Sequence, residues 1–486
     1  AGRAGGFMSL RIHRSRRWTV QTAAAVLLCA SGSYAAPGGS IDFAKNLQRI
    51  DGFGTCQAFQ RAALMRGLFG LRPERQREVL DLLFSREKGA GLSILRLGVG
   101  SSPLGSPWDL MPSIQPGNPG GPAARPRYLW DGDDSGQLWL AKEAYKYGVR
   151  RFYANAWSAP GYMKTNGSDS NGGMLCGVPG AECPTGDWRQ AYADYLLQYV
   201  KFYRGEGIEI TDLGFTNEPD ITVAYASMRF DAAQAIDFLK VLGPRVEASG
   251  LPLSITCCEA TKWNVQAAMT AAIEADPVAR EIVKIHTGHE YGGLARSPLP
   301  TSKTTWMSEY RLAPWNPDWD SGSPASSGLA LANEIHDTLA LANVSAYIHW
   351  TAVSVGDRIG SWIQTDSPGP GYRVAKRLWA MAAYSRFVRP GAFRVPASSP
   401  GAEQKVSAFR NADGVKVINI INNSAAAVTA DFDVSPATAL SAAPAAYLTD
   451  EKHALERVDG VARITGPVLS VQLAPRSLTT LVLPPG

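Results

Sequence analysis

Short apolar runs alternate with longer amphipathic segments along most of this chain. The apolar runs are typical of buried strands, and the amphipathic segments repeat apolar residues at helical spacing. The predicted strands cover 49–54, 92–98, 151–156, 210–216, 253–258, 282–287, 304–308 and 346–350. Helical patterns lie between them at 74–84, 138–147, 188–204, 232–248, 264–275 and 328–341. Eight strand-and-helix units predict an α/β protein with a (β/α)8 TIM barrel, whose functional residues lie at the C-terminal strand ends.

The pattern changes near residue 387, where short alternating strands replace the helical segments. These strands are rich in Val, Ala and Thr and are separated by turn residues, at 405–409, 415–421, 427–432, 446–449 and 479–483. We therefore predict a catalytic barrel over 49–386 and a side β-sandwich domain over 387–486. Residues 36–48 precede the first barrel strand, and we expect them to add a strand to the β-domain.

The first 35 residues have the pattern of a signal peptide. Four arginines between positions 11 and 17 precede an apolar run over 22–30, which is followed by the small-residue site 33–35. An ordinary N-terminal helix is the alternative. The order of basic, apolar and small residues favours the signal peptide, so we expect a secreted, extracellular protein.

The charge balance restricts the classes of partner. The chain has 48 Lys and Arg against 43 Asp and Glu, and five of the arginines lie within residues 1–35, so the remainder is near neutral. Nucleic acid binding needs clustered basic residues, which this sequence lacks. No apolar run after the signal is long enough to span a membrane. We expect a monomer whose partner is a polysaccharide.

The cysteine pattern indicates an oxidised protein without a metal centre. Cys176 and Cys183 close a short Gly- and Pro-containing loop, which predicts a disulfide between them. The pairing of the adjacent Cys257 and Cys258 stays open. Neither C-x-x-C nor H-E-x-x-H spacing occurs, so we expect no metal and no cofactor.

The sequence GFTNEPD over 214–220 ends the fourth predicted strand and places Glu218 at the barrel mouth. A glycosidase needs a carboxylic acid there to protonate the leaving oxygen, and Asn217 beside it could bind the substrate 2-hydroxyl. A helix start, with Asn as the cap and Pro in the first turn, would give the same pattern.

A second acid, Glu309, ends the seventh predicted strand in TTWMSEY. The fourth and seventh strands of an eightfold barrel face each other across the mouth, so Glu309 and Glu218 could approach as the nucleophile and acid/base of a retaining glycosidase. This pairing makes catalysis a better interpretation than a helix cap for Glu218.

Other residues at strand ends suit such a site. Arg96 could keep Glu309 ionised by charge proximity, although a structural ion pair is the alternative. His289 and Tyr291 follow the sixth strand and could orient Glu309, or His289 could simply pack. Three tryptophans could stack on sugar rings, or belong to the core, namely Trp157, Trp306 and Trp350.

The chain resembles glycoside hydrolase family 30, and within it subfamily 7, the mainly fungal xylanases. The stretches that carry this resemblance are DGFGTCQAFQRA, NAWSAPGYMKTNG, GDWRQAYADYLLQYVKFY, LGFTNEPD, LSITCCEA, TTWMSEY and KRLWAMAAYSRFVRPGAFRV. The resemblance implies a barrel with a side β-sandwich, a retaining mechanism and catalysis by Glu218 and Glu309. It also suggests that Arg61 binds the carboxylate of a glucuronic acid branch on xylan.

These observations predict an enzyme, a glycoside hydrolase that cleaves β-1,4-xylosidic bonds of xylan or glucuronoxylan by double displacement. A β-1,6-galactanase or β-1,6-glucanase on the same scaffold is the main alternative, because the carboxylate pair fixes stereochemistry and not the sugar. A non-catalytic carbohydrate-binding protein is a further alternative, which the pair of acids disfavours.

Overall fold

The fold is a closed parallel barrel joined to a β-rich domain. The computed structural model describes residues 38–104, 111–356, 359–440 and 442–485, so the expected signal peptide lies outside the described residues. The barrel consists of β2 (Gly52–Cys56), β3 (Ile94–Val99), β4 (Arg151–Ala156), β5 (Asp212–Gly214), β6 (Ser254–Ala260), β7 (Val283–His289), β8 (Thr304–Tyr310) and β9 (Ala346–Trp350). This confirms the predicted fold class, and all eight predicted strands overlap the observed ones.

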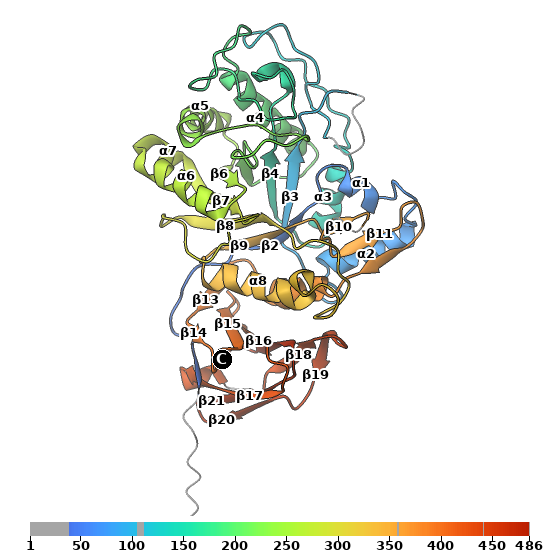
Figure 1. Cartoon of the computed structure of the whole chain (residues 1–486), viewed down its shortest axis with the longest axis vertical. Helices are drawn as coiled ribbons and strands as arrows, with labels where there is room; N and C mark the ends of the chain where they lie inside the picture. The colour runs from blue at the N-terminus through green and yellow to red at the C-terminus, as the bar shows by residue number, and fades with distance from the viewer. Residues whose placement is uncertain (1–37, 105–110, 357–358, 441, 486) are drawn as a thin grey trace, which may run out of the picture. The chain divides into compact units, whose positions relative to one another are not determined.

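Helices surround the barrel (Figure 1). They are α1 (Arg61–Met65), α2 (Pro73–Phe84), α3 (Gln137–Lys146), α4 (Arg189–Gly205), α5 (Ala232–Ser249), α6 (Trp263–Ala275), α7 (Pro277–Ile282), α8 (Gly328–Ala340) and α9 (Arg377–Ser385). The Asp231 side chain caps α5 by accepting a hydrogen bond from the backbone N–H of Gln234. The Gln234 side chain in turn accepts a hydrogen bond from the backbone N–H of Asp231. The connection from β7 to β8 contains no helix, so this strand pair departs from the regular alternation.

The barrel strands are buried on both faces, which explains their continuous apolar runs. Inside the barrel, Ile94, Tyr153, Ile285, Trp306 and Ile348 form one apolar cluster below the mouth. A small sheet of β10 (Val353–Ser354), β11 (Ile363–Thr365) and β12 (Tyr372–Val374) follows the last barrel strand. It had no counterpart in the sequence prediction.

Two sheets make up the β-domain. The first has the order β14-β1-β17-β21-β20, with β14 (Ala397–Ser398), β1 (Gly39–Asp42), β17 (Val428–Ser435), β21 (Val468–Leu473) and β20 (Ala462–Thr465). The second has the order β13-β15-β16-β22-β18-β19, with β13 (Phe393–Val395), β15 (Gln404–Arg410), β16 (Lys416–Asn422), β22 (Ser477–Leu483), β18 (Ala445–Thr449) and β19 (Ala454–Val458). Apolar side chains of both sheets form a shared core, as in a sandwich.

The N-terminal strand β1 belongs to the β-domain although it precedes the barrel. It pairs in parallel with β17, with Ile41 opposite Val434, and antiparallel with β14. In Figure 1 this blue strand lies among the orange and red strands of the β-domain. Phe409, Val417 and Leu478 of the β-domain share an apolar cluster with barrel helices, so the two parts pack through a continuous core.

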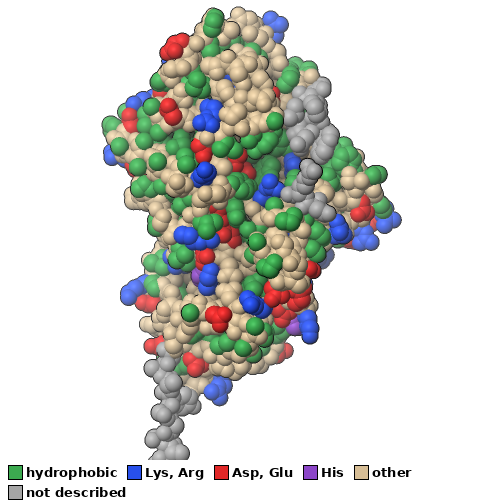
Figure 2. All heavy atoms as spheres, in the orientation of Figure 1, with side chains coloured by type: hydrophobic (Ala, Val, Ile, Leu, Met, Phe, Trp, Pro, Cys, Tyr) green, Lys and Arg blue, Asp and Glu red, His purple; other side chains and the backbone are tan. Residues whose placement is uncertain are grey.

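Disulfides join Cys176 to Cys183, as predicted, and Cys257 to the adjacent Cys258. Cys56 is a buried free thiol, and burial raises its pKa to about 12. Among the residues that the structure describes, no helix is both long and apolar enough for a membrane span. Lys, Arg, Asp and Glu side chains are interspersed over the face shown in Figure 2.

Candidate active site

A cavity of about 440 Å³ opens at the C-terminal ends of the barrel strands. Its lining residues are Phe59, Arg61, Trp157, Glu218, Ile221, Tyr225, Thr261, Tyr291, Glu309, Arg311, Trp350 and Ile359. Both predicted catalytic acids are therefore at its wall, Glu218 shortly after the fourth barrel strand β5 and Glu309 within the seventh, β8.

The two acids lie close enough to act on one bond. One oxygen of Glu218 and one oxygen of Glu309 are within 4.8 Å of each other. Carboxyl groups of retaining glycosidases are roughly 5–5.5 Å apart, whereas inverting enzymes need about 6.5–9.5 Å to admit water between acid and sugar. The spacing in this cavity is thus compatible with direct attack by one carboxylate.

Arg96, on β3, binds Glu309, the predicted nucleophile. Its side chain is fully buried; one terminal nitrogen donates to Glu309 Oε2, and the other donates to Asn217 Oδ1 at 2.7 Å. The guanidinium also lies 4.5 Å from the ring centroid of Trp157. These contacts hold the Glu309 carboxylate and the Asn217 side chain in fixed positions beside the guanidinium.

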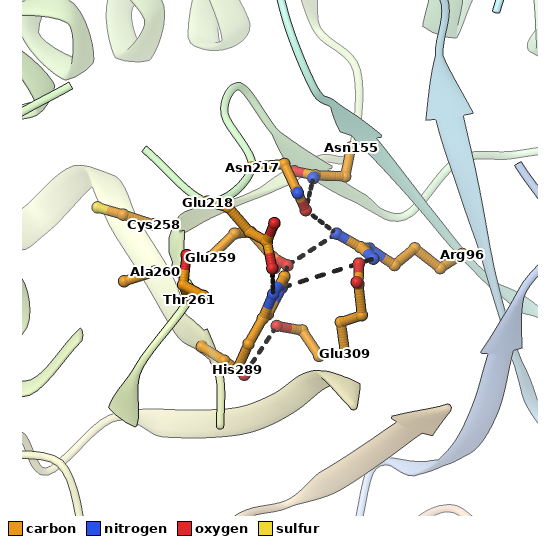
Figure 3. Close-up of polar contacts among 12 residues, drawn as sticks. Arg96, Asn155, Asn217, Glu218, Cys258, Glu259, Ala260, Thr261, His289 and Glu309 are labelled. Carbon is orange, nitrogen blue, oxygen red and sulfur yellow. Dashed lines mark hydrogen bonds and ion pairs between the residues drawn. The ribbon is translucent and has the colours of Figure 1, made fainter. Parts of the chain in front are cut away.

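His289, at the end of β7, lies between the acids (Figure 3). Its Nδ1 is 3.3 Å from Glu218 Oε1, and its Nε2 is 2.6 Å from Glu259 Oε2. Burial lowers the pKa of His289, but Glu309, followed by Glu218 and Glu259, outweighs burial and raises the pKa to about 10. The imidazole is therefore a cation near neutral pH and donates hydrogen bonds from both nitrogens.

Tyr291 contacts the other oxygen of the nucleophile. Its hydroxyl donates to Glu309 Oε1 at 3.2 Å. Burial, and then the negative charge of Glu309, raises the pKa of Tyr291 well above its ordinary value, so the hydroxyl keeps its proton. Across the cavity, the Tyr225 hydroxyl lies 3.4 Å from Glu218 Oε2, which makes Tyr225 a cavity residue that the sequence reasoning missed.

Glu259 is the most consequential residue that the sequence reasoning missed. It lies in β6, is 1% exposed, and accepts hydrogen bonds from Arg96 at 2.8 Å and from the Tyr153 hydroxyl at 2.6 Å. Burial raises the pKa of Glu259, but Arg96 and then His289 outweigh burial and lower the pKa to about 2. Its position at the end of the fifth barrel strand was the signal that could have identified it.

The structure separates the three predicted tryptophans. Trp157 and Trp350 line the cavity, with ring centroids 5.7 Å apart, and the Arg61 guanidinium lies 5.5 Å from the Trp350 ring. Arg61 itself also lines the cavity, and one of its terminal nitrogens donates to the backbone carbonyl of Phe59 at 3.2 Å.

The prediction that Trp306 stacks on sugar is wrong. Trp306 is fully buried inside the barrel, its Nε1 donates to Asp51 Oδ2 at 2.9 Å, and Arg151 covers its ring at 4.5 Å. Strand β8 continues to Tyr310, beyond the predicted end at residue 308, so Trp306 lies deeper than expected. It supports the barrel instead of contacting substrate.

Glu218, His289 and Glu309 also converge closely enough to be considered as metal ligands. His289 Nδ1 faces Glu218 and Nε2 faces Glu259, so both ring nitrogens are engaged by carboxylates in this arrangement. The donor set fits a hydrogen-bonded ion-pair network better than a metal site.

Comparisons with known proteins identify the family of the fold. The glycosyl hydrolase family 30 TIM-barrel domain matches residues 128–267. The catalytic domain of GH30 xylanase C from Talaromyces cellulolyticus is similar in structure, with a TM-score of 0.83 and 35% sequence identity over 91% of this chain and 99% of that one.

More distant relatives are named for activities on different glycans. The glucuronoxylanase XynC of Bacillus subtilis is 25% identical over 358 residues, which cover 71% of this chain and 76% of the relative. An endo-1,6-β-D-glucanase of Neurospora crassa is 21% identical over 77% of this chain and 79% of the relative. The shared scaffold is therefore used on more than one glycan.

Proposed function

This chain belongs to glycoside hydrolase family 30, and we propose that it is a retaining enzyme that cleaves β-1,4-xylosidic bonds of xylan. The observation that carries the retaining mechanism is the separation of under 4.8 Å between oxygens of Glu218 and Glu309. The 35% identity with a xylanase over nearly its whole catalytic domain supports the choice of substrate.

In the first step, Glu309 attacks the anomeric carbon while Glu218 protonates the glycosidic oxygen. The Glu309–sugar bond forms, the glycosidic bond breaks, and the leaving chain departs with the proton of Glu218. Arg96 fixes one oxygen of Glu309 and Tyr291 the other, which orients the carboxylate before attack.

In the second step, Glu218 acts as the base. It removes a proton from water, whose oxygen attacks the anomeric carbon and releases Glu309 as a carboxylate. The protonated His289 beside Glu218 stabilises the negative charge that Glu218 carries in the intermediate. Two inversions at the anomeric carbon give net retention.

The aromatic wall suits a pyranose chain. Trp350, which is partly exposed, presents apolar surface next to the acids, with the nearly buried Trp157 and Phe59 packed against it, and sugar rings pack on such surfaces through their C–H faces. Arg61 adds a positive charge beside Trp350, which favours a substrate with carboxylate branches, such as glucuronoxylan. We therefore propose, more narrowly, that the chain belongs to subfamily 7 and acts on glucuronoxylan.

We also propose that the protein is exported. Two disulfides among the described residues fit an oxidising compartment and the signal-like pattern of residues 1–35. N-terminal sequencing of the secreted protein, with a start near residue 36 as the expected result, tests this proposal.

Product analysis tests the substrate proposal. Purified protein is incubated with glucuronoxylan, linear arabinoxylan and β-1,6-glucan, and the products are identified by chromatography and mass spectrometry. We expect xylo-oligosaccharides from at least one xylan, formed with retention by NMR, and none from Glu309→Gln. Products from β-1,6-glucan alone would replace xylan as the substrate, and inverted products would refute the retaining mechanism.

A further inference from the structure

Glu259 joins the two halves of the catalytic pair without contacting the cavity. Its carboxylate binds Arg96, which binds Glu309, and it binds His289, which binds Glu218. Its backbone carbonyl accepts the N–H of Glu218 at 2.8 Å. Figure 3 shows the side-chain contacts that connect Arg96, Glu259 and His289 with the two acids.

A β-bulge and an unusual backbone conformation place the Glu259 side chain. The ladder between β6 and β7 shifts register between Cys258 and Ala260, and Glu259 has a φ of +62°, in the left-handed region that few non-glycine residues adopt. Gln266 of α6 secures the bulge, because its Oε1 accepts the N–H groups of both Cys258 and Ala260, at 3.3 and 3.2 Å. Strained bulges of this kind re-aim side chains at functional sites.

The charges of the neighbouring groups explain why a carboxylate is present at position 259. In the resting state that the proposed mechanism requires, Arg96 and His289 are cations, Glu259 and Glu309 are anions, and Glu218 holds the proton, so the network is neutral. In the intermediate Glu309 is an ester and Glu218 is the anion, so the network is neutral again. Without Glu259 both states would carry one buried positive charge, and buried unpaired charge is costly.

We propose that Glu259 is a positioning residue of the catalytic reaction: it holds Arg96 against the nucleophile and keeps His289 a cation beside the acid/base. Glu259 thereby acts through its two partners and does not touch the sugar. This inference rests on the proposed glycosidase mechanism but not on the identity of the glycan.

The test compares Glu259→Gln with wild type by two readouts. NMR titration of isotope-labelled histidine, with His289→Asn used to assign the signal, measures the pKa of His289 without any substrate. We expect the substitution to lower this pKa by about 1–3 units, because an adjacent anion is lost. On the glycan that product analysis identifies, kcat should fall about 100-fold with KM changed by less than about threefold.

Two further variants make the result specific. Glu259→Asp keeps the negative charge but holds it farther from Arg96 and His289, because the Asp side chain is shorter. Compared with Glu259→Gln, it should therefore restore part of kcat and part of the rise in the His289 pKa. Glu290→Gln is the matched control, because Glu290 is another buried glutamate, directly after His289, whose carboxylate instead accepts hydrogen bonds from Arg296 and from the backbone N–H of Ala295. Its kcat and KM should remain within about twofold of wild type.

A wild-type His289 titration together with wild-type kcat in Glu259→Gln would overturn the proposal. If Glu259→Gln does not fold, Glu259→Asp decides, and an unchanged pH profile and kcat in that variant would overturn the proposal equally. If no glycan is cleaved, the titration still tests the link between Glu259 and His289, so failure of the proposed function is recognised separately.

Discussion

Replacement of Arg96 by Met should destabilise the protein in a pH-dependent manner. The pKa of Glu259 is about 2 in the folded protein against an ordinary value of 4.5, and this difference of roughly 2.5 units corresponds to about 3 kcal/mol. Burial acts against ionisation, so Arg96 is the main source of this stabilisation, followed by His289. We expect Arg96→Met to lower the free energy of unfolding by about 3 kcal/mol at pH 7.

The pH dependence identifies the cause. Because the folded pKa of Glu259 is depressed, its contribution is complete above pH 4.5, the ordinary value, and is lost as the pH falls towards 2. The difference between wild type and Arg96→Met should therefore be smaller at pH 3.5 than at pH 7. Denaturant unfolding followed by circular dichroism at both pH values measures it.

A surface pair provides the control. Arg77 contacts Glu143 at 3.1 Å, but the Arg77 side chain is 58% exposed, so Arg77→Met should cost at most about 1 kcal/mol. A loss below 1 kcal/mol in Arg96→Met, or an equal loss at pH 7 and pH 3.5, would refute the assignment of Glu259 and Arg96 as a strongly coupled buried pair.

Four further variants test other parts of the description. Trp306→Phe should lower stability by about 1–2 kcal/mol in thermal unfolding with KM unchanged, whereas Trp350→Ala should raise KM for xylan about tenfold in steady-state kinetics. Replacing Cys176 and Cys183 by Ser should lower the free energy of unfolding by about 2–3 kcal/mol in denaturant titrations. Arg61→Gln should reduce kcat/KM about tenfold on glucuronoxylan and less on arabinoxylan; equal losses on both would argue against branch recognition.

The barrel was predictable because its strands are buried on both faces and end in polar residues. Ala346–Trp350 and Arg151–Ala156 match their predicted ranges because a clear apolar run and a clear stop coincide. The position of Glu309 followed from the same rule. The strands β10–β12 lacked such a signal, since each is only two or three residues long, too short to show an alternating or continuous apolar pattern.

The sequence could not show how deep inside the barrel each residue of a strand lies. Trp306 and Glu309 are three residues apart in β8, yet one is in the barrel interior and the other lines the cavity. Glu259 directly follows the predicted strand 253–258, as Glu309 follows its own, but its contacts with Arg96 and His289 depend on a bulge in β6 that the sequence does not show. Bulges arise from contacts such as those of Gln266, which a local pattern does not contain.

The place of β1 determines how this enzyme can be divided or recombined. Since β1 lies between β14 and β17, a single cut near residue 386 would leave one strand of the sandwich attached to the barrel and remove its neighbours. The same cut would expose the apolar surface that helix α9 shares with Phe409 and Leu478. Chimeras that exchange catalytic barrels among relatives should therefore keep the N-terminal strand and the C-terminal sandwich together, from the same parent protein.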